Sequence, residues 1–275
     1  MSIRPEKWSD PANKLFPYQV AFTAPPHDFD AAPSDFLRIC PPDVGVHGRL
    51  LHAPVYAHEL TQRADNFHLL EEYVHCMSNA GADVAGQVGT NWVHANGTDV
   101  HDIRRFVGEM SDKYEMPFHM AGLTLVEACE AMGYERVALN SVYFWPDWRD
   151  GVVRFLRSAD IDVVWFGNFV DQGWYATQEE VNDHTWIFPG NLALDSMQHA
   201  LDAAGAVDAV LVNGMSNYRD ARGLPQRLVS LAADIEAEIE TPVLAADVTL
   251  YWRIFTTLGV APQGRHGSLL RSLQT

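Results

Sequence analysis

The chain has 275 residues, enough for one large hydrophobic core or two smaller ones, and its 47% of hydrophobic residues is typical of a globular protein. Its 36 acidic and 19 basic side chains give a net charge of −17. Such a surface repels phosphate backbones and anionic lipids, so we expect no nucleic-acid partner and no membrane partner. No apolar run approaches the roughly 18 residues of a membrane span, and the N-terminus lacks the layout of a secretory signal, so we expect a cytoplasmic protein.

Short β-rich runs alternate with longer amphipathic runs from the N-terminus to residue 245. The predicted strands, in chain order, are Gln19–Thr23, Gly48–His52, Val84–Val88, Pro117–Met120, Val137–Ser141, Val163–Phe166, Ala209–Asn213 and Val243–Ala245. The segments of helical period between them include Glu59–Asn79, Asp99–Lys113 and Leu224–Glu238. This alternation predicts an α/β fold built from parallel βαβ units with right-handed crossovers.

An internal repeat divides the chain into two similar halves. A shift of 125 positions superimposes identical residues in seven places, namely Asp83 on Asp208, Gly89 on Gly214, Glu115 on Glu240, Pro117 on Pro242, Ala121 on Ala246, Thr124 on Thr249 and Leu125 on Leu250. We therefore predict an N-terminal half, 1–134, and a C-terminal half, 135–254. The segment 255–275 is expected to pack back on the N-terminal half.

The two glycine turns of the repeat are the predicted ligand site. Gly89–Asn91 and Gly214–Ser216 each follow a buried strand directly. In parallel α/β sheets, ligands bind beyond the carboxyl ends of the strands, where backbone N–H groups suit a carboxylate or phosphate oxygen. Related by pseudo-twofold symmetry, the turns should face one cleft between the halves. The alternative interpretation is that each glycine only permits a tight turn.

At this point the sequence resembles the aspartate/glutamate racemase superfamily, in its arylmalonate decarboxylase and maleate isomerase branch. The resemblance runs from about Val20 to Leu270. The segments that carry it are Ala24–Pro26, Val88–Asn91, Arg136–Leu139 with Tyr143, Asp208–Gly214 and Gly264–Leu270.

The resemblance implies two pseudo-symmetric, flavodoxin-like (Rossmann-like) halves with the active site in the cleft between them. It also implies cofactor-independent chemistry. Racemases and isomerases of this type use one cysteine from each half, whereas the decarboxylase keeps only the second. The decarboxylase binds a carboxylate in a hole of backbone N–H groups, hydroxyls and a tyrosine.

The sequence departs from this family at both cysteine positions. Gly89 occupies the first and Gly214 the second, although an alignment anchored on Asn217 and Arg219 would place Met215 at the second. The carboxylate hole is thus expected to remain while the proton carrier is missing. If the glycines are vacated cysteine positions, the substitution Gly214→Cys should be tolerated.

Three residues are the predicted catalytic group: Tyr143, His119 and Thr90. A histidine of near-neutral pKa suits acid–base work, and a tyrosine can also move a proton; His27, His94 and Asp247 are further candidates. The predicted substrate-binding residues are Pro26, His27, Gly89, Thr90, Asn91, Trp92, Tyr143, Gly214, Met215 and Ser216.

No metal and no cofactor are expected. His68, Glu72 and His75 share one helix face with a spacing that can ligate a metal, but the helix is otherwise an ordinary amphipathic one, so we interpret this face as solvated. Two of the three cysteines, Cys76 and Cys129, are interpreted as buried, inert thiols.

These observations predict a lyase or isomerase that acts on a small carboxylic acid through a carboxylate-stabilised carbanion, with decarboxylation ahead of isomerisation. Two alternatives stay open. One is a hydrolase or hydratase that uses water in the space left by the missing cysteines, and the other is a non-catalytic carboxylate-binding homologue. The sequence is compatible with a homo-oligomer.

Overall fold

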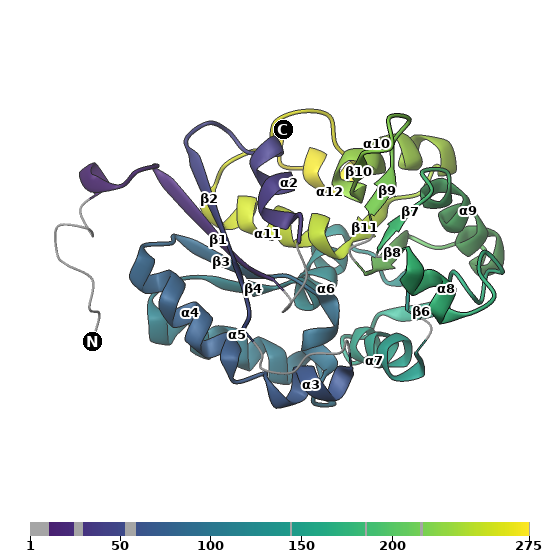
Figure 1. The fold of residues 1–275 in the computed structure, drawn as a ribbon, viewed down its shortest axis with the longest axis horizontal. Coiled ribbons are helices and arrows are strands. Elements are labelled where there is room, and N and C mark those ends of the chain that lie inside the picture. The colour runs from purple at the N-terminus through teal and green to yellow at the C-terminus, as the bar shows by residue number, and fades with distance from the viewer. Residues whose placement is uncertain are drawn as a thin grey trace.

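The computed structural model describes residues 11–24, 30–52, 59–143, 145–184, 186–214 and 217–274. They fold into two four-stranded parallel sheets flanked by helices, with a third, three-stranded sheet (Figure 1). The prediction of an α/β fold with parallel sheets in two halves is therefore confirmed.

The first sheet has the strand order β2-β1-β3-β4. Its strands are β1 (Tyr18–Ala24), β2 (Val44–Leu50), β3 (Val84–Gln87) and β4 (Phe118–Met120). The helices of this half are η1 (Pro11–Asn13), α2 (Ala32–Ile39), α3 (Leu60–Asp65), α4 (Leu69–Ala80), η2 (Thr90–His94), α5 (Val100–Tyr114) and α6 (Ala121–Met132).

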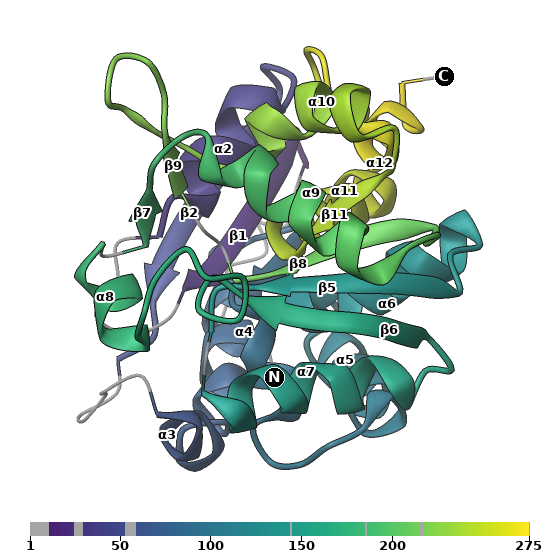
Figure 2. The ribbon, with the colours of Figure 1, turned by 90° about the vertical axis from the view of Figure 1, so that its right-hand side faces the viewer.

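The second large sheet has the order β11-β8-β5-β6. Its strands are β5 (Arg136–Ser141), β6 (Asp162–Asn168), β8 (Ala209–Asn213) and β11 (Val243–Ala245). The helices are α7 (Pro146–Arg157), α8 (Gln178–Asp183), α9 (Leu192–Ala204), α10 (Leu228–Ile239), α11 (Ala246–Leu258) and α12 (Ser268–Arg271). Helices α9 and α7 lie on opposite sides of this sheet (Figure 2). The small sheet joins β7 (Ile187–Phe188), β9 (Asn217–Arg219) and β10 (Pro225–Gln226).

The 125-residue repeat is a structural repeat. The Asp83 carboxylate accepts a hydrogen bond from the backbone N–H of Gln19, at 2.8 Å, near the start of β1. In the other half, Asp208 accepts from the N–H of Arg136, also at 2.8 Å, at the start of β5. The helix-ending residues Glu115 and Glu240 share a left-handed conformation, with φ of 49° and 53°. Matching residues therefore make matching local structure in both halves.

The pseudo-twofold axis passes between α6 and α11. The hydroxyl oxygens of Thr124 and Thr249, which are equivalent residues in the repeat, lie 3.0 Å apart across it. Helix α11 also packs on β3 of the first sheet. A Cβ added at Gly86 of β3 would lie 3.1 Å from Ile254 and 3.2 Å from Leu250, both in α11. The halves are thus joined through the central helices visible in Figure 1.

Some element boundaries differ from the sequence prediction. The strand predicted at Gly48–His52 lies at Val44–Leu50. The predicted helix Glu59–Asn79 is divided into α3 and α4, and at the break the side-chain amide of Asn66 donates to the Gln62 carbonyl at 2.7 Å. The predicted helix start at Leu224 is replaced by β10, since proline breaks the helical pattern there.

The C-terminal segment contacts both halves. The backbone N–H of Gln263 donates to the Ile39 carbonyl at 2.6 Å, whereas that of Ser268 donates to the Glu236 carboxylate at 2.6 Å. The expected boundary at residue 254 lies inside the continuous helix α11, and the domain limits remain a prediction. Within the described residues, no helix has the length and apolarity to cross a membrane.

Candidate functional site

The first glycine turn connects β3 to the 3₁₀ helix η2. Gly89 has φ of 103°, a conformation in which a side chain would be strained, so this turn requires glycine. Thr90, Asn91 and Trp92 follow at once and are all buried. Among the described residues the Thr90 Oγ1 has no hydrogen-bond partner. A buried hydroxyl without a partner is costly, which marks this turn as a place where a ligand oxygen would be favourable.

The first residue of the second glycine turn, Gly214, has nearly the same φ as Gly89. Gly214 has φ of 99°. A Cβ added there would lie 2.5 Å from Cγ2 of Val142 and 3.4 Å from the Tyr143 ring. Tyr143 therefore lies next to the position where the resemblance places a cysteine. Met215 and Ser216, like Pro26 and His27, lie outside the described residues.

An aromatic group connects the two turns. The Tyr143 ring is 4.5 Å from that of Trp148 and 5.3 Å from that of Trp186, between centroids. The guanidinium of Arg63, which is 4% exposed, lies 4.2 Å from the Trp148 ring and 6.0 Å from the Trp92 ring. These contacts bring residues of both halves to one region. They are Thr90, Asn91 and Trp92 of the first half and Tyr143 and Gly214 of the second.

Arg63 is a site residue that the sequence analysis missed. It is a buried cation between two aromatic faces, an arrangement that favours a guanidinium. In a chain of net charge −17, Arg63 places a positive charge within this buried region. The only signal in the sequence was a single arginine in a predicted amphipathic helix, which does not distinguish it from a surface arginine.

Buried polar residues end several strands near the turns. Gln87 and Asn213 are the last residues of β3 and β8, Thr23 is the second-to-last residue of β1, and each of the three is fully buried. Each has one side-chain oxygen without a partner among the described residues. A polar residue at or next to the last position of an apolar strand is a signal that the sequence contained, and it points to the carboxyl ends of the sheets.

His119 is not brought to this group. Its imidazole Nε2 lies 2.8 Å from Oγ1 of Thr257, near the end of α11. Burial, with a smaller effect of Arg253, lowers the pKa of His119 to about 3. An imidazole held neutral beneath a helix does not supply the near-neutral acid–base group for which His119 was chosen.

Asp247 belongs to a buried ionic cluster. The Arg227 guanidinium is 3.0 Å from a carboxylate oxygen of Asp30 and 3.7 Å from one of Asp35. The pKa of Asp247 is raised to about 6. Burial is the largest cause, Arg227 opposes it, and the nearby Asp35 adds to it. This cluster joins α2 of the first half to the start of α10 and α11.

Among the described residues, the thiols of Cys40 and Cys76 contact groups outside the two turns. The Cys40 thiol is directed to the Leu37 and Val44 carbonyls, near the amino end of β2. Burial raises the pKa of Cys129 to about 12, with further contributions from Glu130 and Asp208. Cys76 is in contact with the guanidinium of Arg49.

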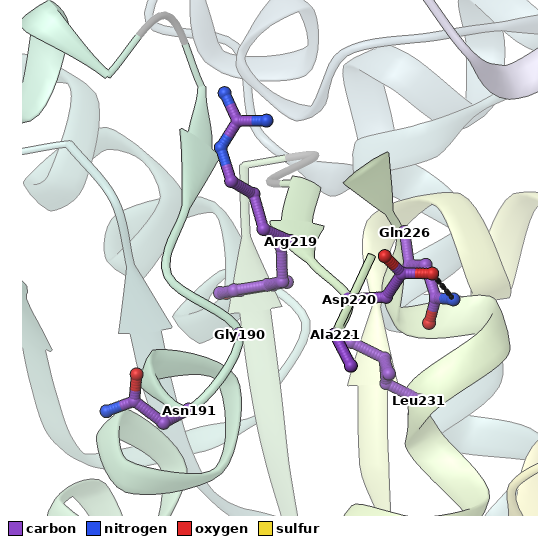
Figure 3. Close-up of a pocket in the computed structure, with 8 residues that line it drawn as sticks. Gly190, Asn191, Arg219, Asp220, Ala221, Gln226 and Leu231 are labelled. Atoms are coloured by element: carbon purple, nitrogen blue, oxygen red, sulfur yellow. Dashed lines mark hydrogen bonds between the residues drawn. The ribbon is translucent and has the colours of Figure 1, made fainter. Parts of the chain in front are cut away.

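Two surface pockets do not include the turn residues. One, of about 470 Å³, lies between the start of α9 and the β9–β10 hairpin, where Gln226 donates to Asp220 (Figure 3). The other, of about 500 Å³, is lined by Arg49, His68, Glu72 and Cys76 among others. His68 is 3.0 Å from the Asp65 carbonyl, and the described residues contain no group of His, Cys, Asp or Glu side chains arranged for a metal ion.

No family model matches the chain, and no curated protein matches it either. Solved structures do match. Unliganded arylmalonate decarboxylase has a TM-score of 0.69 at 16% identity, over 93% of this chain and 99% of that one. Maleate isomerase Iso from Pseudomonas putida has a TM-score of 0.69 at 18% identity, over 93% and 99%. A mutant maleate cis-trans isomerase from Nocardia farcinica, with a covalently bound succinylcysteine intermediate, has a TM-score of 0.68 at 19% identity, over 93% and 98%. The chain therefore has the fold of arylmalonate decarboxylase and maleate isomerase, as the resemblance in its sequence implied.

Proposed function

We propose that this protein is an enzyme of the lyase or isomerase kind that acts on a small carboxylic acid, with decarboxylation of a malonate-type acid ahead of isomerisation. The names of the proteins that share its fold state decarboxylation of an arylmalonate and isomerisation of maleate. The observation that carries the proposal is the position of the Tyr143 ring beside Gly214. Among the described residues, the thiols of Cys40 and Cys76 contact other groups.

The first turn would hold one carboxylate of the substrate. The Thr90 hydroxyl has no protein partner among the described residues, and the backbone N–H groups of the turn lie beside it. The buried guanidinium of Arg63 adds positive charge to the same region. Donors in such a water-poor environment stabilise a developing enediolate more strongly than they stabilise the ground-state acid.

Tyr143 would supply the proton. In decarboxylation the bond from the α-carbon to the departing carboxylate breaks, and its electron pair is delocalised into the remaining carboxylate. The phenol O–H then protonates the α-carbon, and the phenolate regains a proton from water. This reaction needs one proton donor on one face. Racemisation needs a group on each face, and isomerisation through a succinylcysteine needs a thiol, so the residues present favour decarboxylation.

A panel of three acids tests the proposal. Phenylmalonate, methylmalonate and maleate are each incubated with the protein, with detection of CO₂ and chromatography of the products. We expect CO₂ from a malonate, and the rate should be unaffected by iodoacetamide. Conversion of maleate to fumarate would move the activity to isomerisation.

Two other outcomes would replace the proposal. Conversion of maleate to malate would show hydration. Binding of all three acids without product would show a carboxylate-binding protein without catalysis.

A further inference from the structure

A glycine in the middle of α7 lies directly against the ring of His94. A Cβ added at Gly151 would lie 2.6 Å from Cε1 of His94 and closer still to Nδ1. Glycine in a helix interior costs about 1 kcal/mol relative to alanine. Here the close approach of the imidazole accounts for the glycine. Helix α7 of the second half therefore packs closely against η2, which follows the first glycine turn.

His94 in turn contacts Asn91. Its Nε2 lies 2.9 Å from Oδ1 of Asn91, and both side chains are at least 97% buried. The two residues are three positions apart in η2, and side chains at this spacing are eclipsed on a 3₁₀ helix. Among the described residues the Asn91 Nδ2 makes no hydrogen bond.

The hydrogen bond couples the tautomer of His94 to the orientation of the Asn91 amide. Burial, followed by Arg154 and Arg63, lowers the pKa of His94 to about 3, so the ring is neutral at physiological pH. A neutral imidazole has one donor and one acceptor nitrogen. If Nε2 carries the proton, Asn91 accepts with its oxygen and its NH₂ group is available to donate. In the other tautomer the amide is reversed and its oxygen is available instead.

We infer that His94 is a positioning residue, which holds the Asn91 amide through Nε2–H so that the Asn91 NH₂ donates to a carboxylate of the substrate. The carboxylate part of this inference rests on the proposed function. A carboxylate can only accept, so the reversed amide would repel it. Asn91 and Thr90 would then form adjacent side-chain donors on one turn.

The tautomer can be measured without any ligand. Long-range ¹H–¹⁵N correlation spectra of ¹⁵N-histidine-labelled protein at about pH 7 distinguish the two neutral tautomers and the cation. The His94 signal is assigned by its loss in His94→Gln. We expect the neutral Nε2–H form, unchanged down to about pH 5. The Nδ1–H form or an imidazolium would overturn the inference.

Three variants test the consequence for binding. In calorimetric titration with phenylmalonate, His94→Gln should stay within about threefold of the wild-type Kd, because a glutamine N–H can replace Nε2–H. His94→Leu should weaken binding about tenfold to a hundredfold. The matched control is His266→Leu, which removes another buried histidine whose Nε2 bonds a carbonyl, at 2.8 Å from Gln263, and should leave Kd unchanged.

Equal affinity of His94→Leu and wild type would leave His94 a structural role only and overturn the inference. Absence of binding in the wild type would count against the proposed function. The tautomer measured in the spectra would then be the test of how His94 holds the Asn91 amide. Gly151→Ala adds an independent check. Helix propensity alone predicts a higher free energy of unfolding than in the wild type, whereas the contact with His94 predicts a lower one.

Discussion

Tyr143 and Thr90 have different roles in the proposed reaction. Thr90 belongs to the first turn, whose donors are proposed to bind a carboxylate, and Tyr143 lies beside Gly214 in the second half. The two side chains therefore have separable roles, one in stabilising charge and the other in moving a proton.

We expect Tyr143→Phe to lower kcat on a malonate by about a hundredfold or more, with little change in KM, because the phenol acts only in proton transfer. The Phe ring keeps the contacts with Trp148 and Trp186. The measurement is steady-state release of CO₂. A raised KM with unchanged kcat would show that Tyr143 binds the substrate instead. Tyr175→Phe, which changes a tyrosine that packs against Phe169, is the matched control.

We expect Thr90→Ala to lower kcat/KM by about tenfold to a thousandfold, the range for loss of one donor to a developing oxyanion. Thr90→Ser should retain most of the activity because it keeps the hydroxyl. Near-wild-type kinetics of the alanine variant would place the anion site away from this turn.

At the scale of elements, the proposed site depends on two strands that each run into a glycine of positive φ. Gly89 and Gly214 have φ values of 103° and 99°, both in the region that favours glycine. This geometry opposes the expectation that Gly214→Cys is tolerated. The glycines are required by the backbone of the turns, whatever their relation to the family's cysteines.

We expect Gly214→Cys to lower the free energy of unfolding by about 2–4 kcal/mol. The positive φ accounts for about 1–2 kcal/mol of this loss, and the overlap with Val142 for the rest. The double variant Gly214→Cys with Val142→Ala should recover part of the overlap cost and none of the φ cost. Urea unfolding measures both. A single variant as stable as wild type would show that the turn adapts to a side chain.

At the scale of the whole molecule, the free energy of unfolding depends on pH through buried titratable groups. Two buried histidines and one buried aspartate have opposite effects on it. The pKa values of His94 and His119 are lowered to about 3, and that of Asp247 is raised to about 6. In the unfolded chain a histidine binds its proton near pH 6.5 and an aspartate near pH 3.9.

Between about pH 6.5 and 3 the unfolded chain therefore binds more protons at the two histidines than the folded protein does. The contribution of each histidine to the free energy of unfolding is fully present above about pH 6.5. As the pH falls from 6.5 to 3, each contribution decreases by up to about 1.4 kcal/mol per pH unit. Asp247 acts in the opposite sense: its contribution is present below about pH 4 and is lost as the pH rises through 6. The two histidines together outweigh Asp247.

We expect the free energy of unfolding in urea to decrease as the pH is lowered from 7 to 4. His119→Gln should make this decrease shallower, since one of the two buried histidines is removed. Asp247→Asn should make it steeper, since the opposing group is removed. The same pH slope in wild type and both variants would show that other groups control acid stability.

The amino-acid sequence by itself determined the α/β class, the parallel strands, the repeat and both glycine turns. These features depend on local periodicity, on the φ requirement of glycine and on residues such as Asp83 and Asp208 that recur at a constant spacing. Each of these is a property of neighbouring positions or of an ungapped comparison, and therefore can be read without a fold.

Only the tertiary structure decided which side chains meet. Arg63 lies between Trp92 and Trp148, His94 rests on Gly151, and His119 is placed under α11 and away from the turns. The pKa values of the two histidines follow from burial by helices that are distant in the sequence. Contacts of this kind join residues from both halves across the pseudo-twofold axis, and no local pattern in the chain specifies them.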